Sequence, residues 1–232
     1  MKVLVACEES QAVCKAFRDR GFEAYSCDIQ QNSDGFLGDW QWHIEGDALA
    51  VVNGGGFCTM DSKHHYVKQW DLVIAHPPCT YLTKASAVRL FASDGTVKDR
   101  ARFREGIKAR CLFELLLNSD ARFVAVENPV PLSIFGLPKY TQIIEPYLFG
   151  DPWRKKTCLW LNGLPPLEPT NIVEPKGLWV GSTSKRKAGK VYSSYSLKSC
   201  RDQKTRSKTF PGIAEAMADQ WGDFLMRMKE EE

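Results

Sequence analysis

MKVLVACEESQAVCKAFRDRGFEAYSCDI, the stretch from residue 1 to residue 29, predicts a strand, a helix and a second strand. The first apolar run, Lys2–Ala6, has the length of a strand. Residues 10–20 then place Val13 and Phe17 at helical spacing, and residues 23–29 return as a strand. Two short strands joined by one helix pair in parallel. The N-terminus therefore predicts the beginning of an α/β sheet.

The same alternation continues along the chain. Further strands are predicted at residues 70–76, 122–126 and 156–161, and helices at 48–52, 100–118 and 213–229, with a loop at 86–99. The helix at 100–118 is expected to bury a face formed by Phe103, Ile107, Cys111 and Leu115. Strands that alternate with helices predict an open, mostly parallel sheet, whose ligands bind at the carboxyl ends of the strands.

The composition is typical of a globular protein, with 44% hydrophobic and 25% charged residues over 232 positions. The apolar runs are too short to cross a membrane, and the N-terminus lacks a signal-peptide pattern. We therefore expect a cytoplasmic protein without a membrane partner. The eight cysteines form no C-x-x-C pair, and most are expected to be reduced and buried. Cys58, His64 and His65 lack zinc-motif spacing, so no metal site is predicted.

Positive charge is concentrated near the end of the chain. Residues 181–208 hold nine basic residues and a single acid, Asp202, although the net charge of the whole chain is only +3. The basic residues are Lys185, Arg186, Lys187, Lys190, Lys198, Arg201, Lys204, Arg206 and Lys208. This basic block indicates a polyanionic partner, while a solvated loop would explain it equally well.

Two short motifs end predicted strands. Cys79 follows two prolines after the strand at 70–76, and these prolines hold it on a rigid turn. Glu127 begins the sequence Glu-Asn-Pro at the end of the strand at 122–126. Each motif alone is weak evidence. Because the carboxyl ends of parallel strands lie at one edge of a sheet, the two together predict a shared site.

In this order the motifs resemble those of the C5-cytosine DNA methyltransferase family, which has Pro-Cys within a Pro-Pro-Cys loop and Glu-Asn-Val or Glu-Asn-Pro. The resemblance covers most of residues 1–161 and the last 22 residues. It implies a single Rossmann-like AdoMet-dependent methyltransferase domain, with a mostly parallel sheet, helices on both faces and a small basic target-recognition segment. It also implies that Cys79 adds to C6 of a flipped-out cytosine and that Glu127 acts at N3, so that C5 accepts a methyl group from S-adenosyl-L-methionine (AdoMet).

The resemblance places the cofactor in the first strand-helix-strand unit. The family has Phe-x-Gly-x-Gly-Gly there, whereas residues 7–12 are CEESQA and hold no glycine. Glu8 is expected to meet the AdoMet ammonium and Ser10 to cap the helix, while Asp28 suits the ribose hydroxyls and Asp47 the adenine amino group. Turn or helix-capping roles remain the alternative for both aspartates. The implied cofactor-binding set is Cys7, Glu8, Ser10, Asp28, Ile29, Asp47, Ala48 and Pro77.

Further residues are assigned to cytosine and DNA. Residues 150–157 stand where the family has Gln-x-Arg-x-Arg, so Arg154 or Lys156 is expected to reach the target cytosine or a phosphate, with plain surface charge as the alternative. Residues 80–110 carry eight more basic residues that are suited to phosphates. The implied nucleic-acid-binding set is Pro78, Thr80, Asn128, Lys185, Arg186, Lys187, Arg201 and Arg206.

The resulting organisation has three regions. Residues 1–162 form the catalytic core, 163–208 a small recognition segment, and 209–232 a terminal helix that packs back on the core. Double-stranded DNA is the expected partner, with a homodimer left open, and the small size is reminiscent of phage and prophage enzymes. The alternatives are an RNA cytosine methyltransferase, an amino-methyltransferase, a non-catalytic nucleic-acid-binding relative of the fold, and use of a modified AdoMet.

Overall fold

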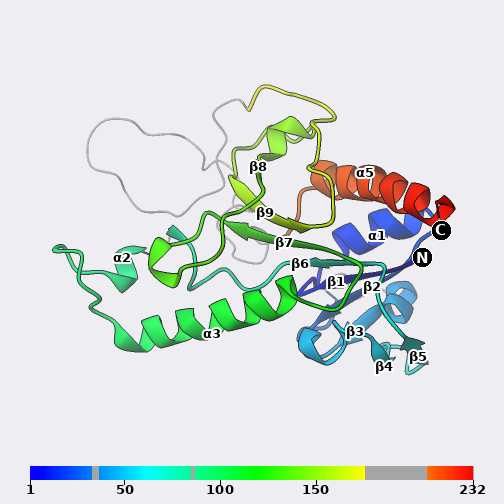
Figure 1. Cartoon of the computed structure of the whole chain (residues 1–232), viewed down its shortest axis with the longest axis horizontal. Helices are drawn as coiled ribbons and strands as arrows, with labels where there is room; N and C mark the ends of the chain where they lie inside the picture. The colour runs from blue at the N-terminus through cyan, green and yellow to red at the C-terminus, as the bar shows by residue number, and fades with distance from the viewer. Residues whose placement is uncertain (33–36, 85–86, 176–207, 232) are drawn as a thin grey trace.

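A seven-stranded sheet forms the centre of the computed structural model, which describes residues 1–32, 37–84, 87–175 and 208–231 (Figure 1). The strand order is β3-β2-β1-β6-β7-β9-β8. All neighbours pair in parallel except β9, which is antiparallel to both β7 and β8. The strands are β1 (Lys2–Ala6), β2 (Glu23–Asp28), β3 (His43–Glu45), β6 (Leu72–Ala75), β7 (Phe123–Pro129), β8 (Gln142–Ile144) and β9 (Thr157–Asn162). The predicted open, mostly parallel, Rossmann-like α/β sheet is confirmed.

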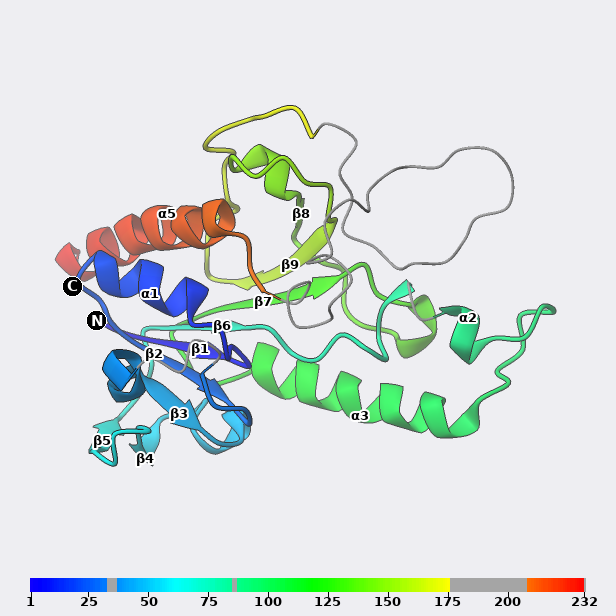
Figure 2. The ribbon, with the colours of Figure 1, turned by 180° about the vertical axis from the view of Figure 1, so that it is seen from behind.

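Helices cover both faces of this sheet, as Figures 1 and 2 show from opposite sides. On one face lie α1 (Ala12–Asp19) and α5 (Pro211–Glu230), and on the other lies α3 (Arg100–Leu117). A separate antiparallel hairpin is formed by β4 (Gly55–Cys58) and β5 (His64–Val67). The short helices are η1 (Leu37–Trp42), η2 (Ala48–Ala50), α2 (Ala87–Leu90), η4 (Ser133–Phe135) and η5 (Pro146–Leu148).

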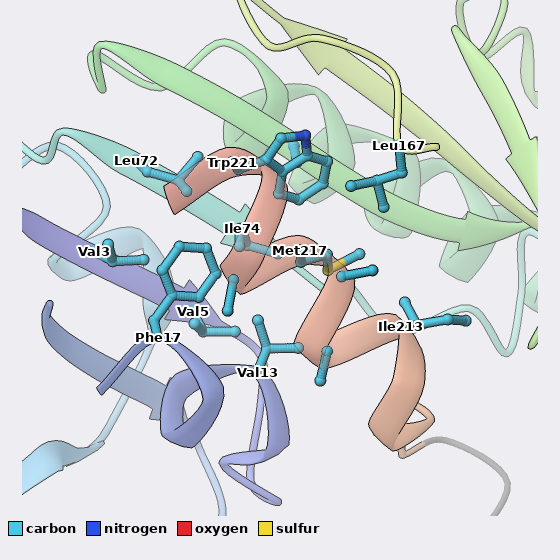
Figure 3. Close-up of a cluster of buried hydrophobic side chains, with 14 of the residues drawn as sticks. Val3, Val5, Val13, Phe17, Leu72, Ile74, Leu167, Ile213, Met217 and Trp221 are labelled. Atoms are coloured by element: carbon cyan, nitrogen blue, oxygen red, sulfur yellow. The ribbon is translucent and has the colours of Figure 1, made fainter. Parts of the chain in front are cut away.

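Side chains of the central strands alternate between two buried clusters. Val3, Val5, Leu72 and Ile74 face α1 and α5, where Figure 3 shows them around Phe17, Met217 and Trp221. Leu4, Ala6, Val73 and Ala75 face the opposite cluster, which includes Phe113 and Leu116 of α3. Burial on both faces explains why these strands are continuous apolar runs instead of alternating apolar and polar residues.

The expected buried face of α3 is wrong. Ile107 and Leu115 are 38% and 55% exposed, and Cys111 is also exposed. The helix instead buries Gly106, Phe113 and Leu116. Apolar spacing identified a stripe, but the contact surface is set by the partners: Gly106 lies against the Phe135 ring, and Phe113 packs edge-on against Trp160 at 4.8 Å between ring centroids.

Several short elements escaped the sequence patterns. The strands β3, β4, β5 and β8 have only three or four residues each, and α2 lies inside the predicted loop at 86–99. The predicted helix at 48–52 is the single 3-10 turn η2. Elements of this length do not establish a periodic pattern of their own, because one or two apolar residues suit either period.

The order of the strands reverses between β1 and β6. From β1 the chain continues to β2 and β3 on one side, whereas β6 leads to β7 on the other. In open α/β sheets, ligands bind outside the carboxyl ends of the strands at such a switch point. Residues 7–11 after β1 and 76–80 after β6 are therefore the places where a site is expected.

We predict that Gly212→Ala destabilises the fold, because a Cβ there would lie 1.8 Å from the Phe149 carbonyl oxygen. That oxygen is a backbone atom, so α5 must move away, and overpacking of this kind costs about 1–3 kcal/mol. Gly46→Ala is the matched control, since a Cβ at that position meets nothing within 4 Å. Urea denaturation measures both, and equal midpoints would contradict the close approach of α5.

Candidate active site

The register of β6 and β7 brings the two sequence motifs together. Ala75 pairs with Val126 in this parallel pair, so His76 and Glu127 follow on adjacent strands. The backbone amide of His76 donates to the Ala6 carbonyl at 2.9 Å, which continues the alignment with β1. Glu127 itself remains within β7 and pairs with Leu159 of β9. His76 is two residues after Ile74 and Glu127 two residues after Ala125. Side chains two apart on a strand point to the same face, so both lie on the face covered by α1 and α5.

His76 and Glu127 form a buried pair. His76 Nδ1 lies 2.9 Å from Glu127 Oε2, and the side chains are only 10% and 12% exposed. Burial by itself raises the pKa of Glu127, but the hydrogen bond from His76 and the charges of Lys155 and His76 outweigh it and hold this pKa below its usual value. Burial lowers the pKa of His76, yet Glu127 and the nearby Glu8 leave it raised. Both pKa shifts favour an imidazolium paired with a carboxylate.

Lys155, in place of Arg154 or Lys156, is the cation beside Glu127. Lys155 and Thr157 line the same small pocket as Glu127, together with Phe210 and Ile213. Arg154 and Lys156 are exposed, and the Arg154 guanidinium lies over the Tyr147 ring. Neighbouring side chains in an extended segment point to opposite sides, so one residue position decides which cation enters the site. Lys155 is two residues before Thr157 of β9, and side chains two apart in an extended segment point to the same side. This spacing could have indicated that Lys155 enters the site.

Cys79 lies on a turn that is anchored to the segment after Glu127. Pro77 is buried and Pro78 exposed, and the Cys79 side chain is half-buried. The Leu82 amide donates to the Cys79 carbonyl at 3.2 Å, and the Leu82 carbonyl accepts from Leu132 at 2.7 Å. Leu132 follows the end of β7 at Pro129, so this hydrogen bond ties the Cys79 turn to the segment after Glu127.

Glu8 caps α1 directly. Its carboxylate accepts hydrogen bonds from the Val13 and Cys14 amides at 2.7 and 3.2 Å, and its side chain is buried. Burial raises the pKa of this carboxyl. Ser10, the expected cap, makes one long contact of 3.5 Å with the Ala12 amide. Glu8 takes the capping role because its longer side chain reaches the second and third amides of the helix from inside the fold.

The loop between β1 and α1 replaces glycine with strained residues. Cys7 and Gln11 have φ angles of 60° and 55°, in the left-handed region. This region costs an ordinary residue about 1–3 kcal/mol and favours glycine. Gln11 is held there by hydrogen bonds from its amide to the Ser26 hydroxyl and the Asp39 carbonyl. The loop thus adopts left-handed conformations at two positions without a glycine.

Three predicted cofactor residues gather at the carboxyl ends of β1, β2 and β3. Burial, followed by the charges of Asp28, Cys27 and Asp47, raises the pKa of Cys7 to about 12. Asp28 is half-buried and accepts from the Gln30 amide at 2.9 Å, whereas Ile29 is 77% exposed. Asp47 accepts a hydrogen bond from the Leu49 amide and caps η2, which is the alternative role named in the sequence analysis. Ala48 is buried.

Asn128 does not face the same way as Glu127. Its side chain is fully buried, and neither amide atom has a hydrogen-bond partner among the described residues. It shares the parity of Val124 and Val126 and therefore points towards the cluster under α3. This burial argues against the predicted direct contact with nucleic acid, whereas Pro78 and Thr80 are exposed.

The basic block of residues 181–208 lies almost entirely outside the described residues, and with it the predicted contacts of Lys185, Arg186, Lys187, Arg201 and Arg206. No group of three metal-ligating side chains occurs in the described part of the chain. Within those same ranges, none of the helices combines the length and the apolar character needed to span a bilayer. Cys58 Sγ and His64 Nδ1 are 3.2 Å apart on the β4–β5 hairpin but form no such group.

Many solved structures resemble this fold, and two of them are methyltransferases by description. A DNA modification methyltransferase encoded within an E. coli prophage is 12% identical, with a TM-score of 0.43 over 78% of this chain and 53% of its own. The S. pombe Dnmt2 methyltransferase is also 12% identical, with a TM-score of 0.38 over 69% of this chain and 48% of its own. The chain spans about half the length of each, and no family model or curated protein matches its sequence.

We predict that Glu8→Ala is less stable than Glu8→Gln by about 1–2 kcal/mol, the value of a helix cap. Alanine leaves the Val13 and Cys14 amides without their acceptor, whereas the glutamine carbonyl retains one acceptor and removes the buried charge. Urea denaturation gives the free energy of unfolding of each variant. Both variants lack the carboxyl group, so the difference between them reports the capping hydrogen bonds alone. Equal stabilities would show that Glu8 does not hold the start of α1.

Proposed function

We propose that the protein is a DNA (cytosine-5-)-methyltransferase in which Cys79 is the nucleophile and Glu127 acts at N3. The observation that carries the proposal is the buried Glu127 carboxylate, which is bonded to His76 and lines a pocket with Lys155, on the strand next to the one that leads to Cys79. A carboxyl group and a thiol on adjacent strands and the turns that follow them are the pair that C5 chemistry requires. The parallel pairing of β6 with β7 supports this proposal.

The switch-point residues fit AdoMet better than a dinucleotide. The Glu8 carboxylate already occupies the first-turn amides of α1, where a phosphate would otherwise bind. A phosphate would find these amides already bonded, whereas the ammonium of AdoMet is itself a donor and does not compete for them. Asp28 is available for ribose hydroxyls, and exposed Ile29 offers an apolar surface for the adenine ring. These residues would hold the cofactor.

Bound AdoMet would supply the methyl group as an electrophile. The chain's own residues prepare the cytosine: Cys79 Sγ bonds to C6, the π electrons shift towards N3, and Glu127 meets N3 by hydrogen bonding or proton transfer. C5 then carries enough electron density to accept the methyl group. Loss of the C5 proton and of the Cys79 sulfur restores the ring. Burial of Glu127 strengthens its interaction with N3 because water does not compete.

Exposed cations beyond the strand ends support a DNA partner. Lys84 follows the Cys79 turn, Arg89 lies on α2, and Lys98, Arg100 and Arg104 lie around the start of α3, all on the exposed surface. Figure 2 shows α2 and the start of α3 projecting beyond the carboxyl ends of the sheet. Cations there suit phosphates on both sides of a flipped cytosine.

The direct test is covalent trapping. With AdoMet and duplex DNA that contains 5-fluorocytosine, we expect an adduct that survives denaturation, because fluorine cannot leave as a cation after methyl transfer. Cys79→Ala should abolish the adduct, while Cys111→Ala, which changes an exposed thiol on α3, should preserve it. An adduct with fluorinated RNA but not DNA would redirect the function to RNA. Methyl transfer to DNA without any adduct would contradict C5 chemistry.

Lys155→Met should move the pH profile of methyl transfer upwards by about one unit, because a nearby cation lowers the pKa of both Glu127 and His76. Lys156→Met is the matched control, since Lys156 is exposed beside the pocket. Initial rates of methyl transfer between pH 5.5 and 9 measure the profile. Equal profiles for the two variants would remove Lys155 from the site.

A further inference from the structure

We propose that His76 positions Glu127 and stores the proton that Glu127 passes to N3 of the target cytosine. The inference rests on the proposed function and adds a residue to it. The motifs that carry the family resemblance, Pro-Pro-Cys and Glu-Asn-Pro, contain no histidine. His76 immediately precedes the first of them and meets the carboxylate of the second.

The position of His76 is well determined by the fold. Its backbone amide is bonded to Ala6 of β1, and its Nδ1 atom is 2.9 Å from Glu127 Oε2. Its other ring nitrogen, Nε2, is buried and has no hydrogen-bond partner in the described part of the chain. Glu127 is therefore the hydrogen-bonding partner of the ring among these residues, and the ring fixes one oxygen of the carboxylate.

The charges around the ring favour an imidazolium. Glu127 acts on it from β7, Glu8 from the loop after β1, and Lys155 from the segment before β9. The hydrogen bond and charge of Glu127 act on the pKa of the ring more strongly than the charge of Lys155. Burial lowers the pKa of His76, but the two carboxylates leave it raised, so the ring is protonated where Glu127 is ionised.

An ionised Glu127 cannot by itself serve N3. A carboxylate has only acceptor sites, and the N3 atom of cytosine is also an acceptor, so the two repel until a proton lies between them. The Nδ1–H group of His76 is a buried proton already in contact with that carboxylate. His76 therefore supplies the proton that Glu127, because of its low pKa, does not itself carry.

The proton and electron movements balance. The Cys79 thiolate pair forms the S–C6 bond, and the C5–C6 and C4–N3 π pairs shift so that N3 gains a lone pair and C4–C5 becomes double. One proton moves from His76 Nδ1 through the Glu127 carboxyl group to N3, which leaves a neutral imidazole and an ionised Glu127. When the ring is restored, the N3 proton returns by the same route, and the C5 proton leaves to solvent.

The test is the pH dependence of methyl transfer to duplex DNA in the wild type and in His76→Asn. The asparagine amide replaces Nδ1 as a donor to Glu127 but carries no transferable proton. We expect kcat at neutral pH to fall about 100-fold, the usual contribution of general acid–base catalysis, while KM for DNA is preserved. The wild-type rate should decline at alkaline pH as His76 loses its proton, and this limb should disappear from the variant. His64→Asn, on the exposed β5 strand, is the control that keeps the wild-type profile.

A second measurement does not depend on the folding of His76→Asn. Nuclear magnetic resonance titration of His76 should give a pKa above its ordinary value in the wild type and a lower one in Glu127→Gln. Wild-type kcat with an unchanged pH profile in His76→Asn would overturn the inference, as would an ordinary or depressed His76 pKa. A wild-type enzyme that neither transfers methyl groups to DNA nor forms the adduct would instead overturn the proposed function, and the inference with it.

Discussion

The parallel pairing of β6 with β7 is the constraint on which the site depends. It aligns Ala75 with Val126 and so sets His76 beside Glu127 at the next position along both strands. A shift of one residue would turn Glu127 to the opposite face, because side chains alternate along a strand. The two buried charged groups tolerate their position only as a pair, since an unpaired charge in the interior costs several kcal/mol.

The same site draws on the antiparallel strand β9, which no simple alternation of strands and helices would provide. Because β9 lies between β7 and β8, the segment before it arrives next to Glu127. Lys155 enters the pocket from this segment, and α5 closes it with Phe210 and Ile213. Residues from three distant parts of the sequence thus determine the electrostatics of one carboxyl group.

The loop between β1 and α1 lacks glycine although parts of its backbone are left-handed. Cys7 and Gln11 adopt left-handed conformations, and the buried Glu8 takes the amides that a glycine-rich turn would present to a ligand. The start of α1 therefore presents fewer free amides to a ligand.

The sequence by itself determined the first parallel strand pair, the main helices and the turn after β6 that carries Cys79, because these depend on local periodicity and on prolines. Glu127 was predicted at a strand end, but β7 continues through Pro129, where it pairs with β9. Tertiary structure alone decided that His76 and Lys155 join Glu127, that Asn128 turns inward, and that α3 buries Gly106 instead of Ile107. These outcomes depend on register and on partners distant in the chain. Local sequence does not determine which distant residue a side chain contacts. Packing therefore decided which sheet face each strand residue occupies and which face of α3 is buried.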